Sequence, residues 1–256
     1  MAPQLQVKDQ KVKQVFLSHD VRRLAEKMCE IGQRSWVRNF NDGNGGNLSV
    51  RVNVDKEYFL VTPTGVSKGF MTPEMMCLVD KTGTKIAWYD GWNRTSEFFS
   101  HLGIYNNVPA ARAIVHAHPN HANAFAITGR QPPSCLIPEV EVFLGPIGLA
   151  PYRTPGSSES GETLGKIAVS HQAIIMTNHG VICWGTNIED AQYKVEILDN
   201  YCAQLLLART LPCRKTVIPP EEMEKLLTMR GGMGLPDPRI GKPIKDWYEE
   251  NPWGKL

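Results

Sequence analysis

The sequence predicts a single α/β domain, and three observations support this prediction. Short apolar or alternating segments typical of strands fill the first half of the chain, the clearest helical periodicity lies in the second half, and no repeat or linker separates the two. A chain of 256 residues can bury a sizeable core, and 42% hydrophobic with 21% charged residues is ordinary for a globular protein. We expect a loosely docked lead-in over residues 1–13, the domain over 14–230 and a C-terminal tail over 231–256.

The first third of the chain predicts a helix, a loop and a series of strands. From Phe16, apolar residues at helical spacing predict an amphipathic helix to about Arg34. The segment 39–47, rich in asparagine and glycine, predicts a loop whose backbone needs positive φ or approaches another group closely. Strands are expected at Leu48–Val52, Tyr58–Val61, Met75–Val79 and Lys85–Trp88.

The second half predicts a hairpin between helices. Residues 130–163 are rich in proline and glycine, and a short strand near Val140–Phe143 and a helix near Glu162–Val169 are expected around loops there. The apolar runs Ala173–Met176 and Val181–Trp184 predict a hairpin with His179 at its tip. Asn187 begins the clearest helix, and a last helix is expected near Glu221–Met229. The apolar stripe of the clearest helix is interpreted as core: Ile188, Ala191, Val195, Leu198, Cys202 and Leu205.

Charge and composition exclude several function classes. A net charge of +2 provides no basic surface for nucleic acid or an anionic membrane, so an anionic ligand must be held by a few local groups. No apolar run approaches the roughly 20 residues of a membrane span, and the polar N-terminus lacks a secretory signal. The six cysteines are scattered without a CxxC pair, which is typical of reduced thiols. A cytoplasmic location is expected.

The run from Ala113 to His118 predicts a buried strand that Pro119 ends, followed by a helix to about Thr128. Alternate side chains of a strand share a face, so His116 and His118 project to the same side. Neutral imidazole is a common zinc ligand. Taken alone, this stretch is equally typical of two hydrogen-bonded histidines.

His179 and Glu97 extend this pattern toward a catalytic metal site. Three histidines and a nearby carboxylate can hold zinc with one open position, where the ion polarises a carbonyl oxygen and the carboxylate handles the proton. Glu97 follows Thr95 and Ser96, whose hydroxyl groups predict a helix N-cap. The alternative role of Glu97 is therefore simple stabilisation of the helix N-terminus.

Small polar clusters can bind phosphate through backbone N–H and hydroxyl groups without net positive charge. The clusters of this kind are Gly46-Asn47, Thr64-Gly65 and Thr95-Ser96. Each of them alone is also typical of an ordinary turn.

Five separated stretches of the chain form a specific pattern: GNGGNLSVR at 43–51, VTPTG at 61–65, TSE at 95–97, IVHAHPNH at 114–121 and TNHG at 177–180. Together they resemble the zinc-dependent class II aldolases of the L-fuculose-phosphate and L-rhamnulose-phosphate type, a family that also includes ribulose-phosphate epimerases and adducin-like heads. The stretches occur in the family's order and span most of residues 14–211.

The resemblance implies a role for each matching residue. His116, His118 and His179 would bind Zn²⁺ or another divalent transition metal, and Glu97 would be the acid/base. The substrate phosphate would be held by Asn47, Thr64, Gly65, Thr95 and Ser96. His121 recurs in relatives without binding the metal, so a supporting role is expected. Family members use a proton-donating tyrosine from a neighbouring subunit or from the C-terminal tail, and Tyr248 is the candidate here, with a packing role equally open.

The resemblance also implies a mainly antiparallel central sheet between helical layers and a homotetramer with sites at subunit interfaces. The leading expectation is retro-aldol cleavage of a phosphorylated (deoxy)ketose into dihydroxyacetone phosphate and an aldehyde, through a zinc-stabilised enediolate. A 4-epimerase or a decarboxylase on the same metal site and a non-catalytic, adducin-head-like interaction module are the alternatives. The related epimerases carry aspartate in place of Glu97, and a decarboxylase needs a cation for the substrate carboxylate, for which Arg153 is the nearest candidate.

Overall fold

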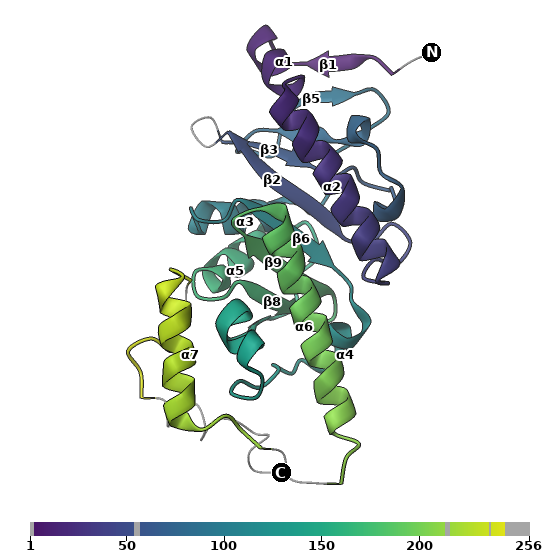
Figure 1. Ribbon diagram of the computed structural model, residues 1–256. Coiled ribbons are helices and arrows are strands. Elements are labelled where there is room, and N and C mark those ends of the chain that lie inside the picture. The colour runs from purple at the N-terminus through teal and green to yellow at the C-terminus, as the bar shows by residue number, and fades with distance from the viewer. Residues whose placement is uncertain (1–2, 54–56, 213–215, 236, 244–256) are drawn as a thin grey trace.

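The computed structural model describes residues 3–53, 57–212, 216–235 and 237–243 (Figure 1). Nine strands of this part of the chain form one sheet in the order β1-β5-β4-β3-β2-β6-β9-β8-β7. All neighbours pair antiparallel except β7 and β8. The strands are β1 (Leu5–Val7), β2 (Asn47–Asn53), β3 (Tyr58–Val61), β4 (Cys77–Val79), β5 (Lys85–Tyr89), β6 (Ala113–Ala117), β7 (Gly148–Ala150), β8 (Ala173–Met176) and β9 (Gly180–Gly185).

Helices cover both faces of this sheet. Two long helices, α2 (His19–Val37) and α6 (Ile188–Ala208), pack on one face, while α3 (Phe98–Asn107) and α5 (Ser158–Ala168) pack on the other (Figure 1). The remaining helical elements are α1 (Gln10–Phe16), α4 (Asn120–Thr128), α7 (Pro220–Gly232) and the short turns η1 (Lys68–Phe70), η2 (Pro73–Met75) and η3 (Val140–Leu144). A mainly antiparallel sheet between helical layers confirms the expected α/β fold.

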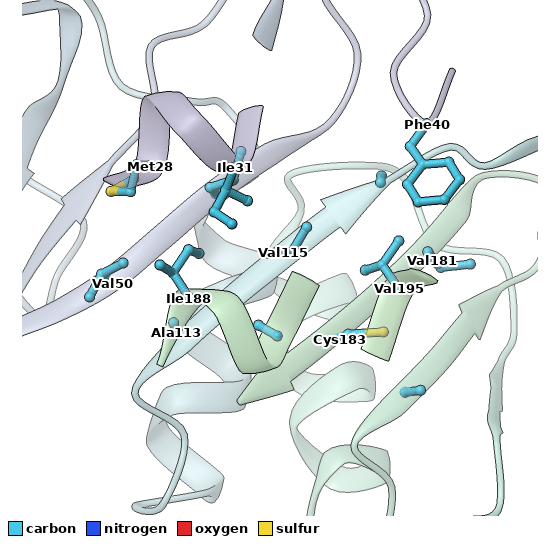
Figure 2. Packing of buried hydrophobic residues seen from close by; sticks show 14 of the residues in the cluster. Met28, Ile31, Phe40, Val50, Ala113, Val115, Val181, Cys183, Ile188 and Val195 are labelled. Carbon is cyan, nitrogen blue, oxygen red and sulfur yellow. The ribbon is translucent and has the colours of Figure 1, made fainter. Parts of the chain in front are cut away.

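The alternation of side chains along β6 divides the core into two clusters. Val115 belongs to the cluster that also contains Met28 of α2 and Ile188 of α6 (Figure 2). Ile114 points to the opposite face and packs with residues of α3 and α5. Because side chains of a strand alternate, His116 shares the face of Ile114. Both faces of the strand therefore pack in the core, and His116 projects from the face that is covered by α3 and α5.

Capping side chains explain where the predicted helices begin. The first long helix starts at His19, later than expected, because Ser18 accepts a hydrogen bond from the Val21 N–H at 3.3 Å. Asn187 accepts from the Asp190 N–H at 2.8 Å, which confirms the predicted start of α6. Helix α5 starts earlier than expected, at Ser158, because Ser157 accepts from the Ser160 N–H at 3.1 Å.

The strand expected at Val140–Phe143 is wrong, because this segment forms the π-helical turn η3. Glu141 is buried there, with one carboxylate oxygen accepting the Cys135 N–H at 2.6 Å and the other paired with Arg239. The Val142 carbonyl oxygen accepts a hydrogen bond from Arg230 at 2.8 Å. Two arginines far along the chain thus determine the conformation, and the local apolar pattern carries no sign of them.

Both ends of the described chain are part of the fold. The segment expected to be a loose lead-in contributes β1, which pairs with β5, and its Val12 is buried at 1% exposure. At the other end, Arg239 is 2% exposed and pairs with Asp237 at 2.8 Å as well as with Glu141. The described part of the expected tail therefore packs on η3.

Two composition-based expectations can be compared with the structure. Within the described residues, none of the helices has the length and apolar character that crossing a membrane requires. Cys29, Cys77, Cys183 and Cys202 are free thiols.

Candidate metal centre

The strand β6 and the β8–β9 turn bring the three predicted histidines together. His116 is the penultimate residue of β6, where it pairs with Asn47 of β2 on one side and with Ile182 of β9 on the other. His118 follows the strand, held by its backbone N–H to the Phe40 carbonyl oxygen at 2.7 Å. His179 lies in the turn before β9, which confirms its predicted position at the hairpin tip.

One ligand atom from each histidine lies within 4.8 Å of those of the other two. The Nε2 atoms of His116 and His118 are 3.1 Å apart, and the ring centroids of His116 and His179 are 4.7 Å apart. His116 is 1% exposed, whereas the side chains of His118 and His179 each keep 17% exposure. The cluster is thus buried on one side and open on the other.

Hydrogen bonds at the outer ring nitrogens fix which nitrogen faces the centre. His116 Nδ1 lies 2.8 Å from the Val181 carbonyl oxygen, and His118 Nδ1 lies 2.8 Å from the Asp42 carboxylate. Both partners accept only, so each Nδ1 donates and each Nε2 presents a lone pair to the centre.

This arrangement fits a bound cation. When both rings are neutral, two lone pairs facing each other at 3.1 Å repel, and an ion between them removes that repulsion. Tetrahedral zinc with Zn–N bonds of about 2.0–2.1 Å places its ligand nitrogens about 3.4 Å apart. Burial lowers the pKa of His116 well below its usual value and lowers that of His179 to about 4, which keeps these two rings in the neutral form that binds metals. The residues present therefore fit a divalent transition metal.

Two glycines permit the close packing around the histidines. A Cβ at Gly180 would lie 2.6 Å from the Ala117 carbonyl oxygen and 2.7 Å from His118 Cδ2. Gly46 has a φ of +71°, and a Cβ there would lie 2.8 Å from the His116 carbonyl oxygen. The loop 39–47 therefore has the positive φ and the close approach that its composition predicts.

Glu97 lies beside the histidine cluster as the residue immediately before α3. Its Oε2 is 3.4 Å from His116 Nε2 and 3.6 Å from His179 Nε2. Burial raises the pKa of Glu97, while the charge of His118, a hydrogen bond from Asn47 and the charge of Lys68 act against that rise. Its side chain makes no hydrogen bond to the helix N-terminus, so its contacts are with the histidines and not with the cap.

The five residues expected to bind phosphate lie in different environments. Asn47 and Thr95 are buried at 3% and 4% exposure, and the Thr95 hydroxyl accepts the Glu97 N–H at 3.2 Å. Thr64, Gly65 and Ser96 are exposed. An isolated antiparallel β-bridge between Pro63 and Arg94 links the segment before Thr64 and Gly65 to the segment before Thr95 and Ser96.

The structure adds three residues that sequence reasoning missed. Asp42 orients His118, and hydrogen bonding to His118 lowers the pKa of its carboxyl. Lys68 is 1% exposed, and its Nζ donates to the Asn44 and Val66 carbonyl oxygens at 2.9 and 2.6 Å, which joins two loops of the site. Burial lowers the pKa of Lys68 to about 8. The third is His101, one helical turn after Glu97, and that spacing was the available signal.

Two further expectations have different outcomes. His121 is hydrogen-bonded through Nδ1 to Asp199 at 2.9 Å, outside the histidine cluster, which agrees with a supporting role. Tyr248 lies outside the described residues, so its assignment as proton donor stays a prediction.

Fold and site together define a class: an α/β protein with a mainly antiparallel sheet whose three converging histidines and neighbouring carboxylate suit a divalent metal. Residues 26–206 match the family described as Class II Aldolase and Adducin N-terminal domain, which is well over half of the chain. The chain belongs to this family.

Individual relatives differ in the reactions that their names state. An L-fuculose phosphate aldolase of Methanococcus maripaludis is 34% identical over 174 residues, covering 68% of this chain and 89% of the relative. A 3-oxo-tetronate 4-phosphate decarboxylase of Haemophilus influenzae is 32% identical over 179 residues, covering 68% of this chain and 83% of the relative. A solved structure named L-fuculose 1-phosphate aldolase superposes with a TM-score of 0.74 at 24% identity, over 83% of this chain and 97% of that one, and supports the fold.

Proposed function

We propose that the chain is a metal-dependent aldolase that cleaves a phosphorylated (deoxy)ketose into dihydroxyacetone phosphate and an aldehyde. The observation that carries the proposal is the half-buried Glu97 carboxylate, 3.4 and 3.6 Å from two of three converging histidines. A metal site with an adjacent carboxylate suits a reaction in which negative charge develops on a substrate oxygen while a proton moves nearby.

The roles divide among the residues as follows. His116, His118 and His179 would hold the ion, Zn²⁺ or another divalent transition metal, which would supply Lewis-acid stabilisation of that charge. Glu97 accepts and returns the proton, because burial raises the pKa of its carboxyl toward the working range of a general acid/base.

The substrate phosphate is assigned to the polar groups around Glu97. The exposed Thr64, Gly65 and Ser96 offer hydroxyl and backbone donors, and Asn47 and Thr95 line the base of the same region. Lys68 supplies a buried positive charge beneath these loops, which compensates a phosphate although the chain as a whole is almost neutral.

A decarboxylase on the same site is the second candidate, and two observations favour it. Relatives named 3-oxo-tetronate 4-phosphate decarboxylase match about as closely as the named aldolases do. Arg153 lines the same pocket as His179 and offers a cation for a substrate carboxylate. The aldolase is placed ahead of the epimerase, because the resemblance implies aspartate in the epimerases where this chain has Glu97, whose longer side chain reaches the histidine cluster.

A panel of ketose 1-phosphates and 3-oxo acid phosphates, each assayed with and without added Zn²⁺, tests the proposal. Dihydroxyacetone phosphate is coupled to a reporter dehydrogenase while parallel samples are analysed for the C4 epimer and for carbon dioxide. If the chain is an aldolase, dihydroxyacetone phosphate is formed without the C4 epimer and without carbon dioxide. Carbon dioxide or epimer without dihydroxyacetone phosphate overturns the aldolase in favour of the corresponding alternative, and inactivity on the whole panel favours a non-catalytic interaction module.

Two parts of the proposal concern assembly. We expect a homotetramer with sites at subunit interfaces. Analytical ultracentrifugation measures the number of subunits directly. Tyr248 is proposed as the proton donor, and Tyr248→Phe should then lower kcat without changing metal content. An unchanged kcat in this variant would assign Tyr248 to packing.

A further inference from the structure

A buried chain of hydrogen bonds leads from α3 to the Glu97 carboxylate. His101 is 0% exposed, and its Nε2 lies 2.6 Å from Asn47 Oδ1. Its Nδ1 lies 2.7 Å from the Ser49 hydroxyl, which in turn lies 2.9 Å from the Tyr105 hydroxyl. On the other side of the Asn47 amide, the side chain of Asn47 interacts with the Glu97 carboxyl and acts to lower its pKa against the effect of burial.

The direction of each of these hydrogen bonds follows from the ionised state of the Glu97 carboxylate. An ionised carboxylate only accepts, so the NH₂ group of Asn47 must face Glu97 and its Oδ1 must face His101. The amide oxygen accepts in turn, so His101 donates from Nε2. Burial lowers the pKa of His101 to about 3, hence the ring is neutral and carries one hydrogen only. Its Nδ1 then accepts from the Ser49 hydroxyl, so the Ser49 hydroxyl oxygen must accept from Tyr105. The single Tyr105 O–H is shared between that oxygen at 2.9 Å and the Ser49 backbone oxygen at 3.0 Å.

We propose that His101 is a positioning residue: its Nε2–H fixes the Asn47 amide so that the NH₂ group holds the Glu97 carboxylate beside His116 and His179. This inference rests on the proposed function only in taking Glu97 as the acid/base. It also gives the Asn47 side chain a task in addition to the phosphate role assigned to this residue above.

Geometry explains why a histidine serves this purpose. His101 follows Glu97 by one turn of α3, so the two side chains lie on the same side of the helix. Asn47 and Ser49 lie on the same face of β2, because side chains of a strand alternate, and they meet the two ring nitrogens of His101. One rigid ring thus connects the sheet to the helix that carries the acid/base, and a displacement of that group by about 1 Å can cost about 100-fold in rate.

Two substitutions of His101 separate positioning from simple core packing. His101→Leu removes both ring nitrogens, whereas His101→Gln retains an N–H donor near the Nε2 position. Tyr105→Phe is the matched control, because it removes a buried polar atom at the far end of the chain and leaves the Asn47 contact in place. Activity is measured per metal-loaded, folded chain on whichever substrate the panel identifies.

We expect His101→Leu to lower kcat by about 10–100-fold with KM changed less than about threefold, and His101→Gln to recover most of that loss. In the Glu97→Gln background, His101→Leu should produce no further loss. A kcat of His101→Leu equal to that of Tyr105→Phe, or a loss confined to KM, overturns the proposal, since a packing role or a phosphate role of Asn47 would give those results.

A measurement that needs no catalysis tests the series of hydrogen bonds independently of the proposed reaction. In ¹⁵N-histidine-labelled, metal-depleted protein, the ring nitrogens of His101, assigned by their loss in His101→Gln, should report hydrogen on Nε2. Hydrogen on Nδ1 overturns the proposal even if the aldolase is active. An inactive panel combined with hydrogen on Nε2 overturns the proposed function and leaves the hydrogen-bonded chain established.

Discussion

Asp199 of α6 caps the N-terminus of α4. One carboxylate oxygen accepts the backbone N–H groups of His121 and Ala122, both at 3.0 Å, and the other lies 2.9 Å from His121 Nδ1. Pro119, the local N-cap residue, makes no side-chain hydrogen bond, so the cap of this helix comes from another element. The contact fixes α4 immediately after the strand that carries His116 and His118.

Asp199→Ala should therefore lower stability without changing the reaction. Loss of an N-cap costs about 0.5–2 kcal/mol, and the 7% exposure of Asp199 favours the upper part of that range. Urea unfolding of Asp199→Ala and Asp199→Asn measures the effect, with the smaller loss expected for asparagine because its side-chain oxygen still accepts. Equal losses in both variants would contradict capping as the source of the stability.

His118→Ala should lose most of the bound metal and of the activity, because two histidines leave an incomplete site. Asp42→Ala should weaken metal binding by about 10–100-fold, since the His118 ring would no longer be oriented from its outer nitrogen. Elemental analysis and chelator competition measure both effects. His19→Ala, whose side chain is 80% exposed, is the control and should retain its metal. A full metal content in His118→Ala would remove this residue from the site.

Glu97→Gln should keep the fold and much of the metal but lose about 100-fold or more in kcat, because the amide cannot exchange a proton. Glu159→Gln is the matched control, since Glu159 is an exposed acid in the first turn of α5. Kinetics and thermal unfolding of both variants are compared. Near-normal turnover of Glu97→Gln with a slightly lower melting temperature would assign Glu97 to helix stabilisation.

The metal-free protein should become less stable as the pH falls below about 6.5, and His101 should contribute to this loss. Burial lowers the pKa of His101 from 6.5 to about 3, so between these values the unfolded chain binds a proton that the folded chain does not. The free energy of unfolding therefore falls with decreasing pH, by at most about 1.4 kcal/mol per pH unit for one group. Urea unfolding from pH 7 to 4 should give a shallower fall for His101→Gln than for the unsubstituted chain. Parallel curves would show that His101 does not titrate in this range.

Glu141→Gln should destabilise the fold by about 3–5 kcal/mol, because it leaves Arg239 with one buried carboxylate partner fewer. Glu139→Gln, at an exposed acid of the same segment, is the control and should stay within about 0.5 kcal/mol. Denaturant unfolding distinguishes the two. A small effect of Glu141→Gln would mean that η3 and the C-terminal segment are held by apolar packing.

Local patterns were sufficient for most of the fold. The stripe from Ile188 to Leu205 and the hairpin around His179 are determined by periodicity and capping within a few residues, and the structure has both where they were predicted. The segment Val140–Leu144 could not be predicted in this way, because its conformation depends on Arg230 and Arg239, which lie far away in the sequence.

The same distinction applies to the candidate site. His116 and His118 were predictable as neighbours because strand geometry places alternate side chains on one face. Asp42 and Lys68 were not, because Asp42 acts through a hydrogen bond to the distant His118 and Lys68 through hydrogen bonds that join two loops. Both residues also lie in segments whose sequence is typical of an ordinary loop or turn. Long-range polar contacts of this kind leave no periodic signal in a single sequence.

Because β6 packs on both faces, the length of this strand cannot change by a single residue without disrupting the fold. Inserting or deleting one residue within Ala113–Ala117 would turn every following side chain to the opposite face, placing Val115 toward the histidine cluster and His116 against α6. Such a change would remove the metal centre and the core at the same position. Insertions of a few residues in the exposed loop 152–155 leave this alternation intact. Length variation among active descendants of this chain is therefore expected in that loop, while β6 keeps a constant length.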